Sequence, residues 1–141
     1  ALLILEVTES LLIEDLDDTI ARMTEIVQLG VRFSIDDFGT GYSSLAYLRR
    51  FSVDKLKIDQ SFVRDMLEDA DDLAILEGVI GLAAAFKREV IAEGVESELQ
   101  RNFLIECGCL NFQGYLFGKP VTSGELRGWI EARADLEYGK T

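Results

Sequence analysis

The chain has 141 residues, of which 26 are acidic and 14 basic, so its formal charge is −12. At 48% hydrophobic it can bury one core, which is typical of one ordinary domain or a piece of a larger one. The chain contains no histidine, which excludes Ser-His-Asp and Cys-His catalysis, histidine-ligated zinc, proximal-histidine haem and histidine pH switches. Its acidic balance argues against a DNA or RNA polymer as partner, because neutralising phosphates needs clustered Lys and Arg.

The longest apolar stretch, around residues 79–86, is far shorter than the roughly 20 residues that cross a bilayer. The first residues lack the basic region and the cleavage site of a secretory signal. We therefore expect a cytoplasmic domain, and membrane tethering would need segments outside this chain. Cys107 and Cys109 lack the second pair that a structural zinc site needs, so we expect reduced thiols.

Apolar runs alternate with helical periodicity, which is typical of repeated βα units and a mostly parallel sheet. A buried strand is expected at residues 2–7, with further strands at 31–37, 55–59, 89–95 and 110–117. Helices are expected from residue 16 to Gly30, over 44–50, over 71–87, from the capping box Ser97-x-x-Gln100 to Gly108, and from the capping box Thr122-x-x-Glu125 onward. No linker separates these elements, so residues 1–141 are predicted to belong to one domain.

Carboxylates follow four successive predicted strands at their carboxyl ends, the edge where α/β active sites lie. They are Glu6, Asp36, Asp37, Asp59 and Glu93. One such residue is weak evidence, because Asp often caps the next helix, but four strands in a row are a stronger signal. Grouped carboxylates repel one another unless cations lie among them, and oxygen ligands favour Mg²⁺ or Mn²⁺ over zinc.

Strand alternation places Lys55, Lys57 and Asp59 on one face of their strand, opposite Leu56 and Ile58. Lys57 then points the same way as Asp59. A lysine among carboxylates can neutralise excess charge, hold an attacking water or act as a base. The simpler alternative is a structural ion pair.

A glycine-containing loop follows the second strand at residues 36–41, and its Gly-Thr-Gly is by itself a weak phosphate-loop signal. Two other carboxylates are expected to lie outside the site. Glu9 comes after the end of its strand and Asp17 lies in a helix, so we expect both to be solvated.

Five motifs occur in order along the chain: Leu-Glu-Val-Thr-Glu-Ser at 5–10, Asp-Asp-Phe-Gly-Thr-Gly-Tyr-Ser-Ser at 36–44, Leu-Lys-Ile-Asp at 56–59, Ala-Glu-Gly-Val-Glu at 92–96 and Gln-Gly-Tyr-Leu-Phe-Gly-Lys-Pro at 113–120. Together they resemble the EAL-domain family of cyclic di-GMP phosphodiesterases. The resemblance implies a TIM-like barrel, but the Glu-Ala-Leu motif and a later metal-binding Asn are absent. Because such a barrel takes about 250 residues, we expect an α/β partial barrel of about five strands, the C-terminal part of one domain.

The resemblance also implies roles for particular residues. Metal-site carboxylates would be Glu6, Asp36, Asp37, Glu93 and Asp59, and the catalytic residues would be Lys57, Glu93 and Asp37. Lys57 would contact the attacking water. Glu96 and Thr40 would support the loop after Asp37, and Gln113, Phe117 and Pro120 would lie near the substrate. The implied cofactors are two Mg²⁺ or Mn²⁺ ions, and the implied reaction is hydrolysis of cyclic di-GMP to linear pGpG.

Three functions remain open at this point. The first is a fragment of such a phosphodiesterase, inactive in isolation because ligand-bearing strands are missing. The second is an inactive receptor that binds cyclic di-GMP without cleaving it. The third, argued without the family, is an enolase-like metal enzyme. Sensory or diguanylate cyclase domains are possible neighbours, and open sheet edges predict self-association.

Overall fold

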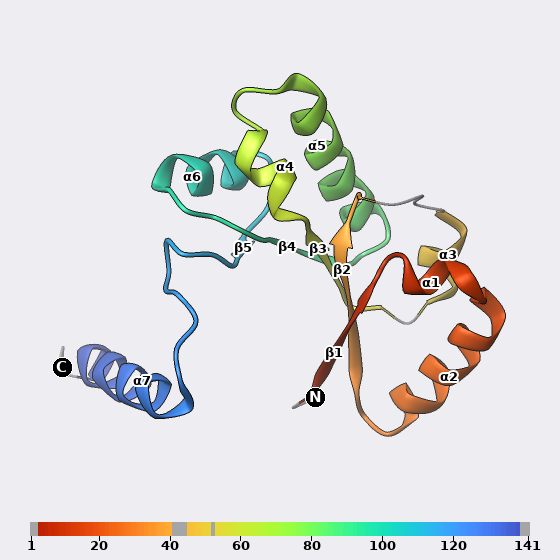
Figure 1. Ribbon diagram of the computed structural model, residues 1–141, viewed down its shortest axis with the longest axis horizontal. Helices are drawn as coiled ribbons and strands as arrows, with labels where there is room; N and C mark the ends of the chain where they lie inside the picture. Colours follow the sequence, from red (N-terminus) through yellow and green to blue (C-terminus); the bar gives the residue numbers. More distant parts are fainter. Residues whose placement is uncertain (1–2, 41–44, 52, 139–141) are drawn as a thin grey trace.

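A five-stranded parallel sheet forms the centre of the protein. The structure, a computed structural model, describes residues 3–40, 45–51 and 53–138. The strands are β1 (Ile4–Thr8), β2 (Arg32–Phe38), β3 (Lys55–Ile58), β4 (Glu89–Ala92) and β5 (Asn111–Phe112). They lie side by side in chain order (Figure 1), so every crossover steps in the same direction. A barrel is wound in this way, whereas a doubly wound sheet reverses direction.

Helices alternate with the strands, as the sequence pattern predicts. They are α1 (Leu11–Glu14), α2 (Leu16–Gln28), α3 (Leu45–Arg50), α4 (Gln60–Asp65), α5 (Ala70–Ala85), α6 (Glu98–Glu106) and α7 (Ser123–Tyr138). The predicted caps are present. Gly30 ends the turn after α2 with φ of +87°, and Ser97 and Gln100 form the capping box of α6. The helices α1 and α4 were not expected from the periodicity.

The hydrophobic core lies between the helices and one face of the sheet. The strand residues of this core that are no more than 2% exposed are Phe33, Ile35, Phe38, Leu56, Ile58 and Ala92. Buried residues of the helices, including Met23, Leu76 and Leu104, belong to the same cluster. The opposite face carries Ser34 and Lys57, so the sheet has one apolar and one polar face.

The first strand differs from its prediction as a buried strand. Ile4 is 40% exposed and Leu5 37% exposed, because within the described residues β1 pairs only with β2. An edge strand of this kind leaves backbone groups and apolar side chains without a neighbour. Leu2, the first residue of the predicted strand, lies outside the described residues, as does Ser44 at the start of the second predicted helix.

The last strand is shorter than the predicted 110–117, because the chain turns away from the sheet at Gly114. The backbone of Gly114 packs so closely on Val95 that a Cβ there would lie 2.2 Å from the Val95 carbonyl oxygen. Leu116 then donates to that same oxygen at 3.0 Å, and Phe117 donates to the Gly114 carbonyl at 3.1 Å. These turn hydrogen bonds replace the ladder that a longer strand would need.

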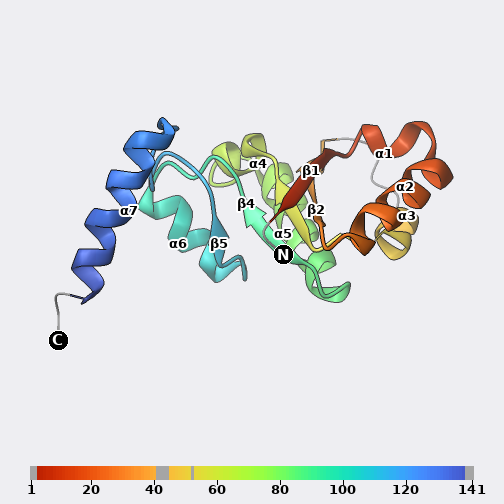
Figure 2. The same cartoon turned by 90° about the horizontal axis from the view of Figure 1, so that it is seen from below.

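Helix α7 lies apart from the sheet, at the opposite end of the molecule from α1, α2 and α3 (Figure 2). Thr122 and Glu125 cap it as predicted, with the Thr122 hydroxyl and the Glu125 carboxylate 2.7 Å apart. Its apolar residues Leu126, Trp129 and Ile130 are 45–54% exposed. None of the helices formed by the described residues has the length and apolarity that a membrane span requires.

Candidate active site

A bulge in β2 brings two neighbouring carboxylates to the polar face of the sheet. Ile35 pairs with Leu56 and Phe38 with Ile58, so two residues of β2 oppose Lys57 alone. Ile35 and Phe38 are both buried on the helix side, and therefore Asp36 and Asp37 share the other side. Asp37 adopts the left-handed φ of +53° that this bulge requires. Without the bulge, strand alternation would separate the two aspartates.

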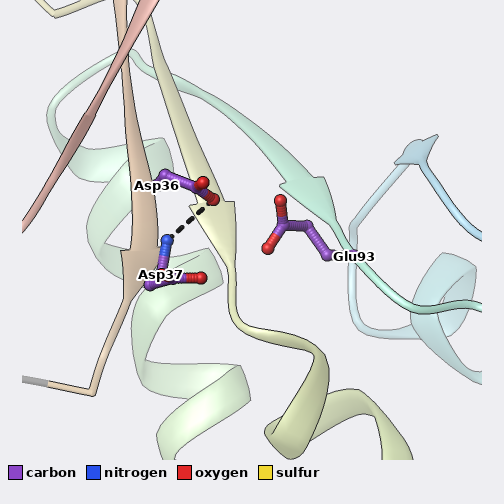
Figure 3. A group of neighbouring side chains, drawn as sticks. All are labelled: Asp36, Asp37 and Glu93. Atoms are coloured by element: carbon purple, nitrogen blue, oxygen red, sulfur yellow. Dashed lines mark hydrogen bonds between the residues drawn. The ribbon is translucent and has the colours of Figure 1, made fainter.

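Glu93 completes a group of three carboxylates. It directly follows β4 and is fixed there by its N–H, which donates to the Ile58 carbonyl at 3.2 Å. One carboxylate oxygen from each of Asp36, Asp37 and Glu93 lies within 4.8 Å of the others. Figure 3 shows Glu93 facing the two aspartates, with the Asp37 N–H donating to Asp36. The acids therefore come from β2 and from the end of β4. The strand between them, β3, carries Lys57.

Burial and neighbouring charge change the protonation of these acids. Burial, together with Asp36, raises the pKa of Glu93 from 4.5 to about 7, against the opposing effect of Lys57. Burial and the charges of Asp36 and Asp59 also raise the pKa of Asp37. Both shifts express the cost of burying negative groups close to one another, which a bound cation would relieve.

Lys57 provides the positive charge that these acids face. Its side chain is 5% exposed, and its Nζ lies 2.7 Å from Glu93 and 2.8 Å from Glu6. Asp36 is 3.9 Å away. Burial alone would lower the pKa of Lys57, but hydrogen bonds to Glu6 and Glu93 raise it, so the amine stays charged. Lys57 therefore lies among Glu6, Asp36 and Glu93 on the polar face of the sheet.

Asp59 lies beside this group and also begins α4. Its carboxylate accepts the Ser61 N–H at 2.8 Å as the N-cap. Burial would raise the pKa of Asp59, but the hydrogen bonds from Ser61 lower it. Capping explains why a short helix follows β3, which the periodicity alone did not indicate.

A pocket of about 480 Å³ opens beside the carboxylates. Its lining joins Asp36, Asp37 and Glu93 to two residues predicted for the site, Glu96 and Gln113. Gln113 continues from β5, and its N–H donates to the Ala92 carbonyl at 2.9 Å. This volume is within the range of small-molecule sites.

Glu9 is not the solvated residue that the sequence indicated. It is 1% exposed, and its carboxylate accepts the Gly39 N–H at 3.3 Å, directly after Asp37 and Phe38. Glu9 therefore supports the loop that follows the two aspartates. Thirty residues separate Glu9 from Gly39, so no local pattern could reveal the contact. Asp17, in contrast, is exposed as expected and pairs with Arg50 at 2.5 Å.

The other predicted residues lie around this centre. The Thr40 hydroxyl donates to the Asp37 carbonyl at 2.7 Å, within the turn after the bulge. Glu96 is exposed, and its backbone N–H donates to the Gln100 side chain at 2.8 Å. Phe117 stacks on Phe112, with ring centroids 6.1 Å apart, and Pro120 is exposed. Gly41 to Ser44 of the second motif lie outside the described residues.

The donor set fits a hard cation. All three clustered ligands are carboxylates, which suit Mg²⁺ or Mn²⁺ better than zinc. Glu6, another predicted metal-site carboxylate, accepts a hydrogen bond from Lys57 at 2.8 Å.

The sequence motifs and this geometry agree with comparisons to known proteins. A family model described as the EAL domain matches residues 1–120. The chain belongs to the EAL domain family. It is 44% identical over 124 residues to the bifunctional diguanylate cyclase/cyclic di-GMP phosphodiesterase MucR of Pseudomonas aeruginosa, and 46% identical over 128 residues to the cyclic di-GMP phosphodiesterase NbdA of the same species. These matches cover 88% and 91% of this chain, but only 18% and 16% of the relatives.

Solved structures of EAL domains are also similar to this chain in fold. The MucR phosphodiesterase in complex with c-di-GMP has a TM-score of 0.84 at 44% identity, with 87% of this chain and 50% of that chain covered. The EAL domain of Mycobacterium smegmatis DcpA has a TM-score of 0.83 at 42% identity, covering 92% and 58%. A manganese/cy-diGMP complex of Klebsiella pneumoniae BlrP1 has a TM-score of 0.76 at 37% identity, covering 83% and 30%. The expected α/β partial barrel is confirmed, and the chain spans about half of an EAL domain.

Proposed function

We propose that this chain is the C-terminal part of a metal-dependent phosphodiesterase that hydrolyses cyclic di-GMP to linear pGpG. The observation that carries the proposal is the group formed by Asp36, Asp37 and Glu93, whose oxygens lie within 4.8 Å of one another beside a pocket of about 480 Å³. The manganese and dinucleotide complexes of EAL relatives support it.

The three carboxylates and Asp59 would hold the ions, with Glu6 contributing from β1. Two bound Mg²⁺ or Mn²⁺ ions would supply Lewis-acid stabilisation and an activated water for in-line attack on phosphorus. Further ligands would come from residues that precede this chain. The enolase-like alternative has no support from MucR and NbdA, both of which are described as cyclic di-GMP phosphodiesterases.

Lys57 would orient the attacking water. Its Nζ is already fixed by two carboxylates at 2.7 and 2.8 Å, so the ammonium group has little freedom to move. With cations holding Glu6 and Glu93, one N–H donor of Lys57 would be available for the attacking water. Glu93 and Asp37 would complete the catalytic groups, as carboxylates that adjoin both Lys57 and the ions.

The remaining predicted residues would act on the loop and the dinucleotide. Thr40 and Glu96 would support the loop after Asp37, a role to which the geometry adds Glu9. Gln113, Phe117 and Pro120 would contact the substrate from the segment after β5. The protein would work in the cytoplasm, where sensory or diguanylate cyclase domains would be its neighbours.

A chimera tests the proposal. In it this chain replaces the matching residues of the MucR EAL domain, which restores the strands that the chain lacks. We expect the chimera with Mn²⁺ to convert cyclic di-GMP to pGpG, detected by chromatography, and the isolated chain to form none. Binding of the dinucleotide without cleavage by the chimera would favour the receptor function. Cleavage by the isolated chain would contradict the need for the missing ligands.

A further inference from the structure

Four arginines converge at the end of the sheet opposite to the carboxylates. A pocket of about 540 Å³ lies where β2, β3 and β4 begin, whereas the acidic group lies where these strands end. Four of the nine arginines of the chain line this pocket: Arg32, Arg49, Arg50 and Arg88. Gathering so many cations is unexpected in a chain with a formal charge of −12.

These cations are mostly uncompensated. Asp54 is the only acidic residue that lines the pocket. Arg50 pairs with Asp17, whose side chain is 83% exposed, so solvent weakens that pair. Among the residues that the structure describes, no carboxylate forms a salt bridge with Arg32 or Arg49.

Arg88 supplies an unsatisfied donor in the same pocket. Its Nη2 reaches the Phe51 carbonyl only at 3.4 Å. Its Nε is buried and has no hydrogen-bond partner within the described part of the chain. A buried N–H without a partner is costly, and a shift of the guanidinium toward an anion in the pocket would remove that cost.

We propose that this pocket binds a small molecule that carries a phosphate group. Guanidinium groups recognise phosphate through paired N–H donors, and several of them from different elements can surround one phosphate or two. The volume suits a small ligand rather than a polymer. Because the pocket and the carboxylates lie at opposite ends of the strands, its ligand binds independently of the metals and of the dinucleotide site.

Calorimetric titration of the purified 141-residue chain with inorganic phosphate and pyrophosphate tests the proposal. EDTA is present throughout, so that phosphate cannot bind through metal at the carboxylates, and ionic strength is held constant. We expect saturable binding, tighter for pyrophosphate, and a higher melting temperature with ligand. Arg49→Gln and Arg32→Gln should each weaken binding by about tenfold or more, with the fold retained.

Matched variants give the outcomes that would overturn the proposal. Arg127→Gln, on α7 and outside the pocket, and Asp36→Asn should leave the affinity unchanged. Absence of saturable binding, or an equal loss in Arg127→Gln, would contradict a defined site. Tighter binding of an acidic peptide than of pyrophosphate would show that the pocket receives a protein segment instead.

Discussion

Lys57 partly compensates the negative charge of the site. Its buried ammonium group contacts Glu6 and Glu93 directly and lies near Asp36. The same strand carries Lys55, whose partner Glu89 is 62% exposed. Two lysines on one face therefore have different surroundings, although the sequence pattern treats them alike.

This difference predicts different costs of removing each lysine. Lys57→Met should lower the free energy of unfolding by about 3 kcal/mol, because it leaves buried carboxylates uncompensated. Lys55→Met should cost less than about 1 kcal/mol, as expected for an exposed pair. Urea unfolding of the metal-free chain measures both, and equal costs would show that Lys57 has no special electrostatic role.

Glu9 provides a second test at this scale. Its removal should release the Gly39 N–H and loosen the loop after Asp37. In the MucR chimera, Glu9→Ala should lower turnover by about 10- to 100-fold, as for other groups that position metal ligands. Glu14→Ala, an exposed acid in α1, is the control. If both variants retain full turnover, support of the loop by Glu9 does not matter for activity.

At the scale of elements, the β2 bulge decides the geometry of the site. The sequence placed Asp36, Asp37 and Glu93 at strand ends correctly, because apolar runs and caps define where each strand stops. It could not reveal that Asp36 and Asp37 share a face, since regular alternation predicts opposite faces. The burial of Glu9 was missed for a related reason, because it depends on a contact between segments far apart in the chain.

The end of β5 depends on Gly114, because the Gly114 backbone packs directly against the backbone of Val95. Gly114→Ala should destabilise the chain by about 1–3 kcal/mol, because its Cβ would overlap Val95 and force the turn to move. Gly78→Ala is the matched control, since nothing lies within 4 Å of its Cβ and it is inside α5. That variant should gain up to about 1 kcal/mol from helix propensity. Thermal unfolding shows whether each variant is less or more stable than the wild-type chain. A stabilised Gly114→Ala would contradict the close approach of the Gly114 and Val95 backbones.

At the scale of the whole molecule, the chain is an open half of a barrel. Ile4 and Leu5 are exposed because, among the described residues, β1 pairs with β2 alone, which composition and periodicity cannot report. The exposed apolar residues of α7 add a second surface without a covering element among the described residues. Both surfaces favour association despite the negative charge.

We therefore expect self-association at micromolar concentration, through the free edge of β1. Light scattering coupled to size exclusion measures the mass of the particle. The double variant Ile4→Lys and Leu5→Lys should shift the population toward monomer, because edge lysines oppose strand pairing. A wild-type chain that stays monomeric at every concentration would show that β1 does not recruit a partner strand.

The central claim is that Asp36, Asp37 and Glu93 form the metal face of a cyclic di-GMP phosphodiesterase. Its most direct test is the rate of pGpG formation by the MucR chimera with saturating Mn²⁺. We expect Asp36→Asn, Asp37→Asn and Glu93→Gln each to lower turnover by orders of magnitude, and Asp17→Asn to leave it unchanged. Comparable rates in all four variants would contradict the assignment of the metal face.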